Sequence, residues 1–277
     1  MRMRVIVTGS GTSTGVPPIG CEAPVCLSGD PRNKRLRSGL YFQELGGQSS
    51  PHAPGEHPLA FIVDCSPDYR QQALTHKINR IDGVLLTHSH FDHVAGLDDL
   101  RIYNFRQKHA LPLYGPAWTL DDVRRRCDYF FNPPQEGGGV ASFDLRPVDP
   151  AVPFVFLDRL AVEPVPVKHG IADVFGYRFG DFAHITDASE IPASSLERLR
   201  GCRVLILNAL RSRPHSTHLS LDEAVEVARD LAPEQTYFVH MNHELDHEET
   251  NAKLPRGMAL AYDGLAFEIE AREATAE

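Results

Sequence analysis

Three histidines and an aspartate crowd into one short segment of the chain. The segment THSHFDH at residues 87–93 follows directly after the apolar run GVLL. Neutral imidazole nitrogens and carboxylate oxygens are ligands that suit zinc, manganese or iron, and a loop at a strand end can turn successive side chains inward. His88 and His90 can share one face of such a loop, whereas Asp92 and His93 turn toward a second point. The pattern therefore favours a site for two divalent metal ions over an ordinary polar loop.

Two metal ions need more ligands than this segment provides, and three further candidates also follow strand-like apolar runs. His169 comes after AVEPVPVK, Asp187 after FAHIT and His240 after TYFV. Any one of them alone is more simply a surface or capping residue. Together with the cluster they predict a complete site, in which Asp187 bridges both ions and one more imidazole completes the shell of each.

Short strands and helices must position these residues. Apolar runs typical of strands occupy residues 4–7, 40–42, 59–63, 83–86, 155–157, 160–167, 174–179, 182–185 and 204–207. Helical periodicity occupies residues 67–75, 94–105, 120–131, 195–199 and 221–231, the last with Ser220 and Glu223 as its capping box. Strand pairs alternate with strand-then-helix units, which indicates an α/β fold with two mixed sheets and helices outside.

Composition limits the classes of protein that fit. A chain of 277 residues with 42% hydrophobic content can bury one large core, so a single domain over residues 1–277 is expected, with a frayed tail after Glu270. The net charge of −9 disfavours binding to long nucleic acid and allows small anionic substrates. The first ten residues hold only a three-residue apolar run, so we expect a cytoplasmic protein with no membrane partner.

Five cysteines and one basic run have two interpretations each. An odd number of cysteines predicts reduced thiols or a partial metal site rather than a disulfide framework. The basic run comprises Arg32, Lys34, Arg35 and Arg37, and it predicts a solvated face or, second, a patch that steers phosphate.

The order of these segments resembles the metallo-β-lactamase superfamily. HSHFDH, VKHG, ITDAS and VHMNH look like its full ligand series, in the binuclear arrangement of its phosphodiesterase branch. The blocks GSGTSTGVPPIGC, VDCSPDYRQQ, GLDDLR and LPRGMALAYDGLAFEIE are similar to those of the phosphoribosyl cyclic phosphodiesterase group. These blocks run from about residue 8 to residue 270, so the resemblance covers nearly the whole chain.

This resemblance implies a four-layer αββα sandwich of two mixed β-sheets, with the active site at one edge. It implies one ion held by His88, His90 and His169, a second held by Asp92, His93 and His240, and Asp187 between them. The expected ions are zinc or manganese, with iron as a further choice, because nitrogen and oxygen ligands do not separate these metals.

The implied activity is hydrolysis of a small phosphodiester, such as a cyclic ribose phosphate or a nucleotide, by a hydroxide that bridges the two ions. Asp92 is expected to take part in catalysis as well as in metal binding. A carbonyl-directed hydrolase of lactones or thioesters is the first alternative. A non-catalytic binding protein of cofactor biosynthesis with the same fold is the second. A tRNA-end-processing endonuclease is disfavoured by the acidic charge, and a homodimer fits the group.

Two more histidines lie in the segment PHSTHL. His218 stands twenty-two residues before His240, the interval at which related phosphodiesterases place a catalytic histidine. We expect His218 to donate the proton to the leaving oxygen, with His215 as the second choice, whereas the plain alternative is a pair that caps the following helix. Further candidates for the substrate pocket, which surface ion pairs explain equally well, are Arg101, Asp98 and Arg211.

A second, structural zinc is the last feature that the resemblance implies. Group members hold it with a Cys-x-Cys-x-x-Cys run and a histidine three residues after the last catalytic one. Cys21, Cys26 and His243 occupy three of these positions, and Ala23 stands at the fourth. Either water or Glu22 completes the shell, or the cysteines are packed thiols without metal, which is the interpretation we favour.

Overall fold

The strands of the protein form two seven-stranded sheets. The computed structural model describes residues 1–46, 57–133 and 139–274. The first sheet has the order β14 (Ala266–Glu270), β1 (Arg2–Gly9), β2 (Gly39–Glu44), β3 (Ala60–Val63), β4 (Gly83–Leu85), β5 (Leu111–Pro116) and β6 (Phe143–Val148). The second has the order β13 (Met258–Leu260), β12 (Gln235–Val239), β11 (Val204–Asn208), β10 (Phe182–Ile185), β9 (Ala172–Phe179), β8 (Leu160–His169) and β7 (Phe154–Phe156).

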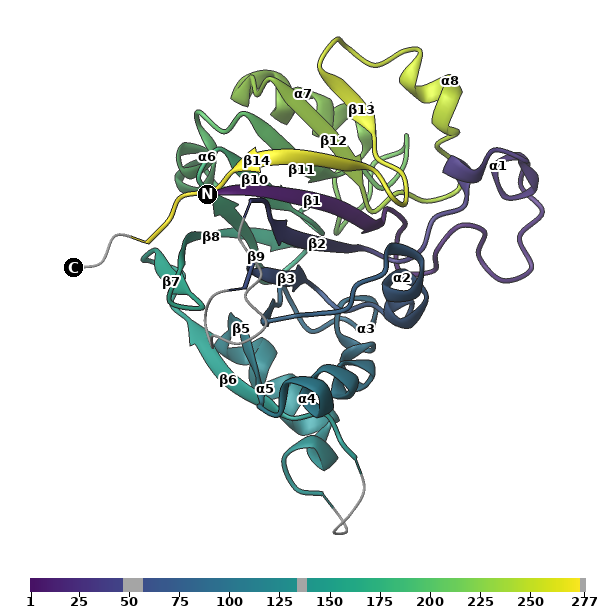
Figure 1. The fold of residues 1–277 in the computed structure, drawn as a ribbon. Coiled ribbons are helices and arrows are strands. Elements are labelled where there is room, and N and C mark those ends of the chain that lie inside the picture. The colour runs from purple at the N-terminus through teal and green to yellow at the C-terminus, as the bar shows by residue number, and fades with distance from the viewer. Residues whose placement is uncertain (47–56, 134–138, 275–277) are drawn as a thin grey trace.

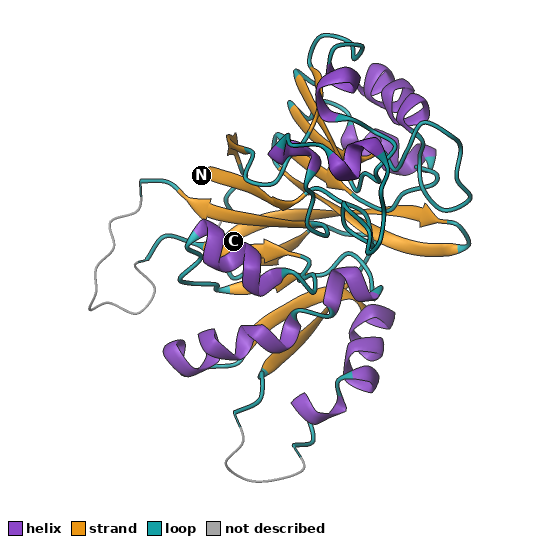
Figure 2. Ribbon diagram, turned by 90° about the vertical axis from the view of Figure 1, so that its right-hand side faces the viewer, coloured by secondary structure: helices purple, strands orange, loops and turns teal. Residues whose placement is uncertain are grey.

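Helices cover the outer faces of both sheets (Figure 1). Against the first sheet lie α2 (Tyr69–His76), α3 (Phe91–Val94), η2 (Leu97–Leu100), α4 (Arg101–Gln107), α5 (Ala117–Arg126) and η3 (Asp128–Phe130). Against the second lie α6 (Ala193–Leu199) and α7 (Leu221–Leu231). The remaining helices are α1 (Pro24–Leu27), η1 (Pro31–Asn33) and α8 (His247–Asn251). Figure 2 shows the resulting layers from the side.

The core between the two sheets is built from aromatic side chains. Phe42 and Phe61 stack with ring centroids 4.5 Å apart, and Phe179 and Phe182 complete the group from the opposite sheet. Separate apolar cores fill the space between each sheet and its helices. Burial on both faces explains why strands such as AFIV at residues 60–63 are apolar throughout. The four layers confirm the αββα sandwich.

Several elements differ from the sequence-based expectation. The strands β5, β6, β13 and β14 were not predicted; β5 reads LPLYGP, and its prolines hide a strand pattern. The single helix expected at residues 94–105 is instead divided into α3, η2 and α4. Gly96 lies at the first division, where an added Cβ would come within 2.1 Å of the Ser66 backbone oxygen. The capping box of α7 is confirmed, with Ser220 accepting from the Glu223 backbone.

The segment after Glu270 is tied to both sheets, which corrects the expected frayed tail. The Ala271 backbone N–H donates to the Met1 backbone oxygen, and the Ala161 backbone N–H donates to the Arg272 backbone oxygen. The last three residues lie outside the described part of the chain. None of the helices within residues 1–46, 57–133 and 139–274 has the length and apolar character to cross a membrane.

Candidate metal centre

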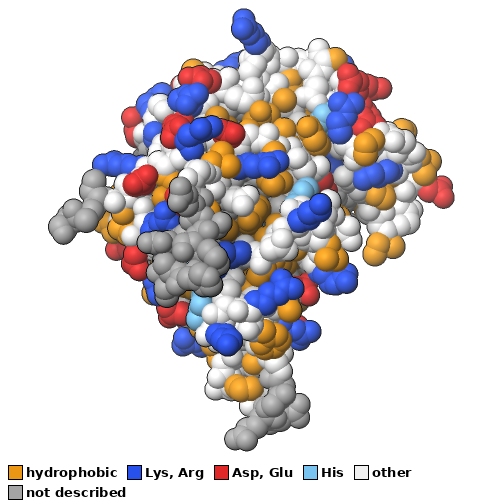
Figure 3. Space-filling model, in the orientation of Figure 1, with side chains coloured by type: hydrophobic (Ala, Val, Ile, Leu, Met, Phe, Trp, Pro, Cys, Tyr) orange, Lys and Arg blue, Asp and Glu red, His pale blue; other side chains and the backbone are white. Residues whose placement is uncertain are grey.

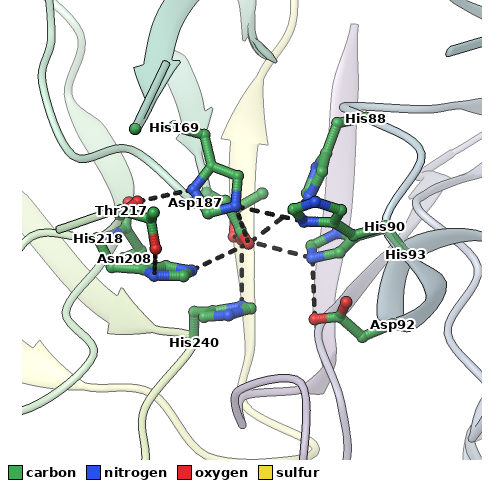
Figure 4. Close-up of polar contacts among 12 residues, drawn as sticks. His88, His90, Asp92, His93, His169, Asp187, Asn208, Thr217, His218 and His240 are labelled. Carbon is green, nitrogen blue, oxygen red and sulfur yellow. Dashed lines mark hydrogen bonds and ion pairs between the residues drawn. The ribbon is translucent and has the colours of Figure 1, made fainter. Parts of the chain in front are cut away.

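The seven predicted ligands converge at one edge of the sandwich. The segment 88–93 follows β4 of the first sheet, whereas His169, Asp187 and His240 end or follow β8, β10 and β12 of the second. Their side chains point toward Asp187 in Figure 4. They form two groups whose ligand atoms lie within 4.8 Å of one another, and Asp187 belongs to both: His88, His90, His169 and Asp187; Asp92, His93, Asp187 and His240.

The first group surrounds one oxygen of the shared carboxylate. Asp187 Oδ2 lies 3.7 Å from His88 Nε2 and 4.0 Å from His169 Nε2. His90 Nδ1 lies 3.3 Å from His169 Nε2. His90 is exposed, unlike the other three, so this half of the centre opens toward solvent.

The second group surrounds the other oxygen and is buried. Asp187 Oδ1 lies 3.1 Å from His240 Nδ1 and 3.4 Å from His93 Nε2. Asp92 Oδ2 lies 3.3 Å from His93 Nε2. One carboxylate thus faces two separate sets of donors, which is the arrangement of a ligand that bridges two ions.

Hydrogen bonds orient three of the imidazoles through Nδ1 and leave Nε2 available. His93 Nδ1 donates to Asp64 Oδ2 at 2.7 Å. His169 Nδ1 donates to the backbone oxygen of Thr217 at 2.7 Å. Thr87 Oγ1 donates to Asp64 and therefore accepts from His88 Nδ1, at 3.0 Å. Such partners fix the tautomer that binds a metal ion.

Three residues of the centre adopt the left-handed backbone conformation. Asp64, Asp187 and His240 have φ angles of 61°, 56° and 58°. Each follows the end of a strand, so this conformation turns the chain sharply and presents the side chain at the sheet edge. Left-handed backbone costs residues other than glycine about 1–3 kcal/mol each, and such strain concentrates at functional sites.

The donor atoms fit divalent metal ions. His88 Nε2, His93 Nε2, His240 Nε2 and Asp92 Oδ2 are buried, and none of them makes a hydrogen bond of regular geometry with another described residue, since the contacts of His93 Nε2 with Asp92 and Asp187 are only close approaches. Burial lowers the pKa of His88 well below its ordinary value and that of His240 to about 4, so both rings are neutral. Although burial opposes it, the nearby imidazoles hold the pKa of Asp187 well below the usual range. Buried imidazoles and carboxylates with unused lone pairs are costly unless a cation occupies the site.

His218 lies against this centre, whereas His215 lies behind it. His218 Nε2 is 3.2 Å from Asp187 Oδ2, and the His218 ring stacks on His240 with centroids 4.9 Å apart. His215 Nδ1 lies 3.4 Å from His218 Nδ1, and Thr217 Oγ1 is within 3.1 Å of both rings. The geometry therefore places His218, rather than His215, beside the predicted ligands.

Cys21, Cys26 and His243 also come together, at α1, which contains Cys26. The two sulfur atoms lie 3.2 Å apart, and burial raises the pKa of the Cys26 thiol to about 11. Glu22 is exposed and lies outside the group of three, so the structure gives no support to Glu22 as a fourth ligand.

The predicted charged candidates make local contacts with neighbouring residues. Arg101 pairs with Asp98 at 3.1 Å over η2 and α4, and Arg211 donates to the backbone of Arg213 and Pro214. The basic run was expected to form a solvated face or a patch that steers phosphate. Arg35 does neither, because it is 2% exposed and donates to the backbone oxygens of Asn242 and Leu245. On the face in Figure 3, Lys and Arg side chains are scattered among acidic and apolar ones.

Sequence reasoning missed the residues that orient the ligands. Asp64 follows β3, and Thr87 follows β4 just before His88. Ser38 Oγ lies 3.1 Å from His240 Nδ1. Asn208 fixes the turn at Asp187 with two hydrogen bonds: its Oδ1 accepts from the Ala188 backbone N–H, and its Nδ2 donates to the Ala188 backbone oxygen. For Asp64 a signal existed, since it is an acidic residue directly after an apolar strand.

Comparison with known proteins gives consistent matches. The β-lactamase superfamily domain matches residues 60–241. A curated relative from Porphyromonas gingivalis, named octanoyltransferase, is 39% identical over 272 residues, which are 97% of this chain and 52% of the relative. The chain therefore spans about half the length of that relative.

Solved structures match the whole chain. A diphosphatase described as a new member of the PhnP family is 40% identical, with a TM-score of 0.87 and 98% coverage of both chains. Zinc-bound PqqB from Methylobacterium extorquens has a TM-score of 0.73 at 21% identity, covers 95% of this chain and 99% of its own, and shares the fold.

Proposed function

The chain belongs to the metallo-β-lactamase superfamily, in its phosphodiesterase branch, and we propose that it hydrolyses a small phosphodiester with two divalent metal ions. The observation that carries this proposal is the position of Asp187, whose two carboxylate oxygens face separate groups of ligands. The similarity to a structure described as a diphosphatase supports a phosphoryl centre as the point of attack.

The two groups that share Asp187 would hold the ions, each with its own three side chains. When bound, the ions supply a nucleophilic water and neutralise negative charge on the phosphoryl oxygens. The more exposed side of the centre, at His90, leaves room for a substrate to approach.

His218 is suited to protonate the leaving oxygen. Its Nδ1 lies 2.9 Å from Thr217 Oγ1, and its ring stacks on His240, so Nε2 is directed at the centre. A histidine fixed in this way can donate a proton to the departing alkoxide, which contributes roughly 10²–10⁴-fold to the rate. His215 contacts His218 and Thr217 and is better placed to hold them than to reach a substrate.

Exposed apolar side chains flank the ligands and suit the organic part of a substrate. Phe91 follows His90 directly and is 69% exposed, and Ile171 stands two residues after His169 and is fully exposed. A sugar or base can pack against such surfaces while its phosphate reaches the ions. With the net charge of −9, this favours a small substrate over a long nucleic acid.

A substrate panel with zinc, manganese or iron tests the proposal. We expect turnover of bis-aryl phosphodiesters, cyclic ribose or nucleotide phosphates, or diphosphate diesters, together with two metal ions per chain. Asp187→Asn and His90→Ala should abolish turnover, whereas His109→Ala, which changes an exposed histidine outside both groups, should keep it. Wild-type rates in Asp187→Asn protein, or no turnover of any phosphodiester by metal-loaded enzyme, would contradict the proposal.

A thioester hydrolase is the second candidate, because one relative at 39% identity is named octanoyltransferase. The chain covers only half of that relative, and the acyl transfer could reside in the other half. Hydrolysis of an octanoyl thioester at a rate above that of every phosphodiester in the same panel would favour this candidate.

A further inference from the structure

Cys21, which precedes α1, and Cys26, which lies within it, are closer than a shared zinc ion would hold them. Their Sγ atoms lie 3.2 Å apart, and the Cys26 thiol donates to Cys21. Two thiolates on one tetrahedral zinc, with bonds of about 2.3 Å, lie about 3.8 Å apart. The separation is therefore short for a zinc site and brings the two sulfurs toward bonding range.

The group also lacks a complete set of ligands. Among the described residues it contains Cys21, Cys26 and His243, with no further cysteine, histidine or carboxylate within the same radius. Ala23, at the position where the fourth ligand would stand in the sequence, packs beside the pair and has no donor atom. Structural zinc sites almost always have four protein ligands, so this group is a poor fit for one.

We propose that Cys21 and Cys26 are a modification site, which a small-molecule disulfide converts into an intramolecular disulfide. The thiolate of Cys21 attacks one sulfur of the external disulfide, whose sulfur–sulfur bond breaks and releases a thiolate that takes a proton from water. Cys26 then loses its proton to solvent, bonds to Cys21 Sγ and expels the second thiolate, which is also protonated. Two cysteine thiols are oxidised, and one external disulfide is reduced to two thiols.

The surroundings support Cys21 as the attacking residue. Cys21 is partly exposed, whereas Cys26 is buried, and the hydrogen bond from Cys26 stabilises negative charge on Cys21. A cavity of about 1120 Å³ between α1, α7 and α8 is lined by Ala23 and His243, the neighbours of the pair, and Cys21 itself is partly exposed, so a small reagent can approach the group. Figure 1 shows α1 at the edge of the molecule, near α8.

The disulfide would alter a loop that leads to the metal centre. His243 stands three residues after His240, and its buried Nδ1 has no hydrogen-bond partner among the described residues. In a reducing compartment the pair would remain a dithiol, and it would close when the ratio of disulfide to thiol rises.

Peptide mapping of the metal-loaded enzyme tests this proposal without an activity assay. The protein is equilibrated with mixtures of reduced and oxidised glutathione, alkylated and cleaved with trypsin, which leaves both cysteines in the single peptide 5–32. We expect this peptide to become about 2 Da lighter and to resist alkylation, while Cys65, Cys127 and Cys202 stay alkylated. Cys26→Ser should instead retain one glutathione on Cys21, because the resolving thiol is gone.

Zinc content provides the opposing outcome. Ala23→Cys restores a fourth ligand, so we expect it to bind one zinc ion more per chain than wild type and to oxidise more slowly. An extra zinc ion already present in wild type and lost in Cys26→Ser would overturn the proposal. Alkylation of both cysteines in the most oxidising mixture would overturn it as well.

Discussion

Asp64 holds His93 in place, and changing it to asparagine tests how strongly that contact sets the metal centre. Asp64 Oδ2 accepts from His93 Nδ1 at 2.7 Å, and Oδ1 accepts from the Thr87 backbone at 2.8 Å. Asparagine has the same shape and tolerates left-handed backbone. Its amide N–H would face His93 Nδ1 and favour the tautomer with a proton on Nε2, which cannot bind metal. We expect metal affinity or kcat/KM to fall about 10–100-fold, or about 1.4–2.7 kcal/mol.

The assay for Asp64→Asn combines metal titration with phosphodiester turnover at limiting metal. Excess metal should restore part of the lost rate, since the variant weakens binding more than it changes the chemistry. Asp64→Ala is the matched comparison. Alanine tolerates the left-handed backbone at a φ of 61° less well than asparagine, so this variant should also lower the free energy of unfolding. Affinity and rate within twofold of wild type in Asp64→Asn would refute the assigned role of this hydrogen bond.

Four other features lead to measurable outcomes. His218→Ala should lower kcat about 10²–10⁴-fold at unchanged metal content, while His215→Ala lowers it less than about tenfold; equal losses in steady-state assays would contradict the assigned roles. Chelation should lower the Tm in calorimetry by about 5–10 °C, since each ion at 100-fold above its Kd contributes about 3 kcal/mol; an unchanged Tm would argue against ions that bridge the sheets. Burial raises the pKa of Asp263 to about 6, above its unfolded value of 3.8, so its contribution to stability is present at low pH and is lost as pH rises through 6. Urea unfolding should show up to about 3 kcal/mol of this loss in wild type and none in Asp263→Asn. Gly96→Ala should destabilise the fold by about 1–3 kcal/mol, because its Cβ would lie 2.1 Å from a backbone oxygen, whereas Gly29→Ala, which faces open space, should stay within about 0.5 kcal/mol.

The ligand candidates could be predicted from sequence because their signal is local. Metal-binding residue types directly after apolar strands are visible in the segment 87–93 and again at His169, Asp187 and His240. Carboxyl ends of parallel strands meet at one sheet edge, so residues distant in sequence can be expected to converge. The structure brings these side chains together, and their role as ligands stays a prediction.

The supporting residues could not be predicted because their partners are distant or lack side-chain chemistry. Ser38 is 202 residues from His240, and no local pattern connects them. The partner of His169 is the backbone oxygen of Thr217, which every residue type possesses. The strand β5 was hidden by Pro112 and Pro116, although it pairs with β4 on one side and β6 on the other. Arg35 is buried where it donates to Asn242 and Leu245, which lie in the distant loop between β12 and α8.

Neither sheet by itself carries a full set of candidate ligands. The segment 88–93 belongs to the first sheet, and His169, Asp187 and His240 belong to the second. During synthesis the chain would therefore expose isolated imidazoles for some time, with His240 the last to appear. Hydrolytic competence would arise only after both halves have docked, so a partly made or half-folded chain would lack activity.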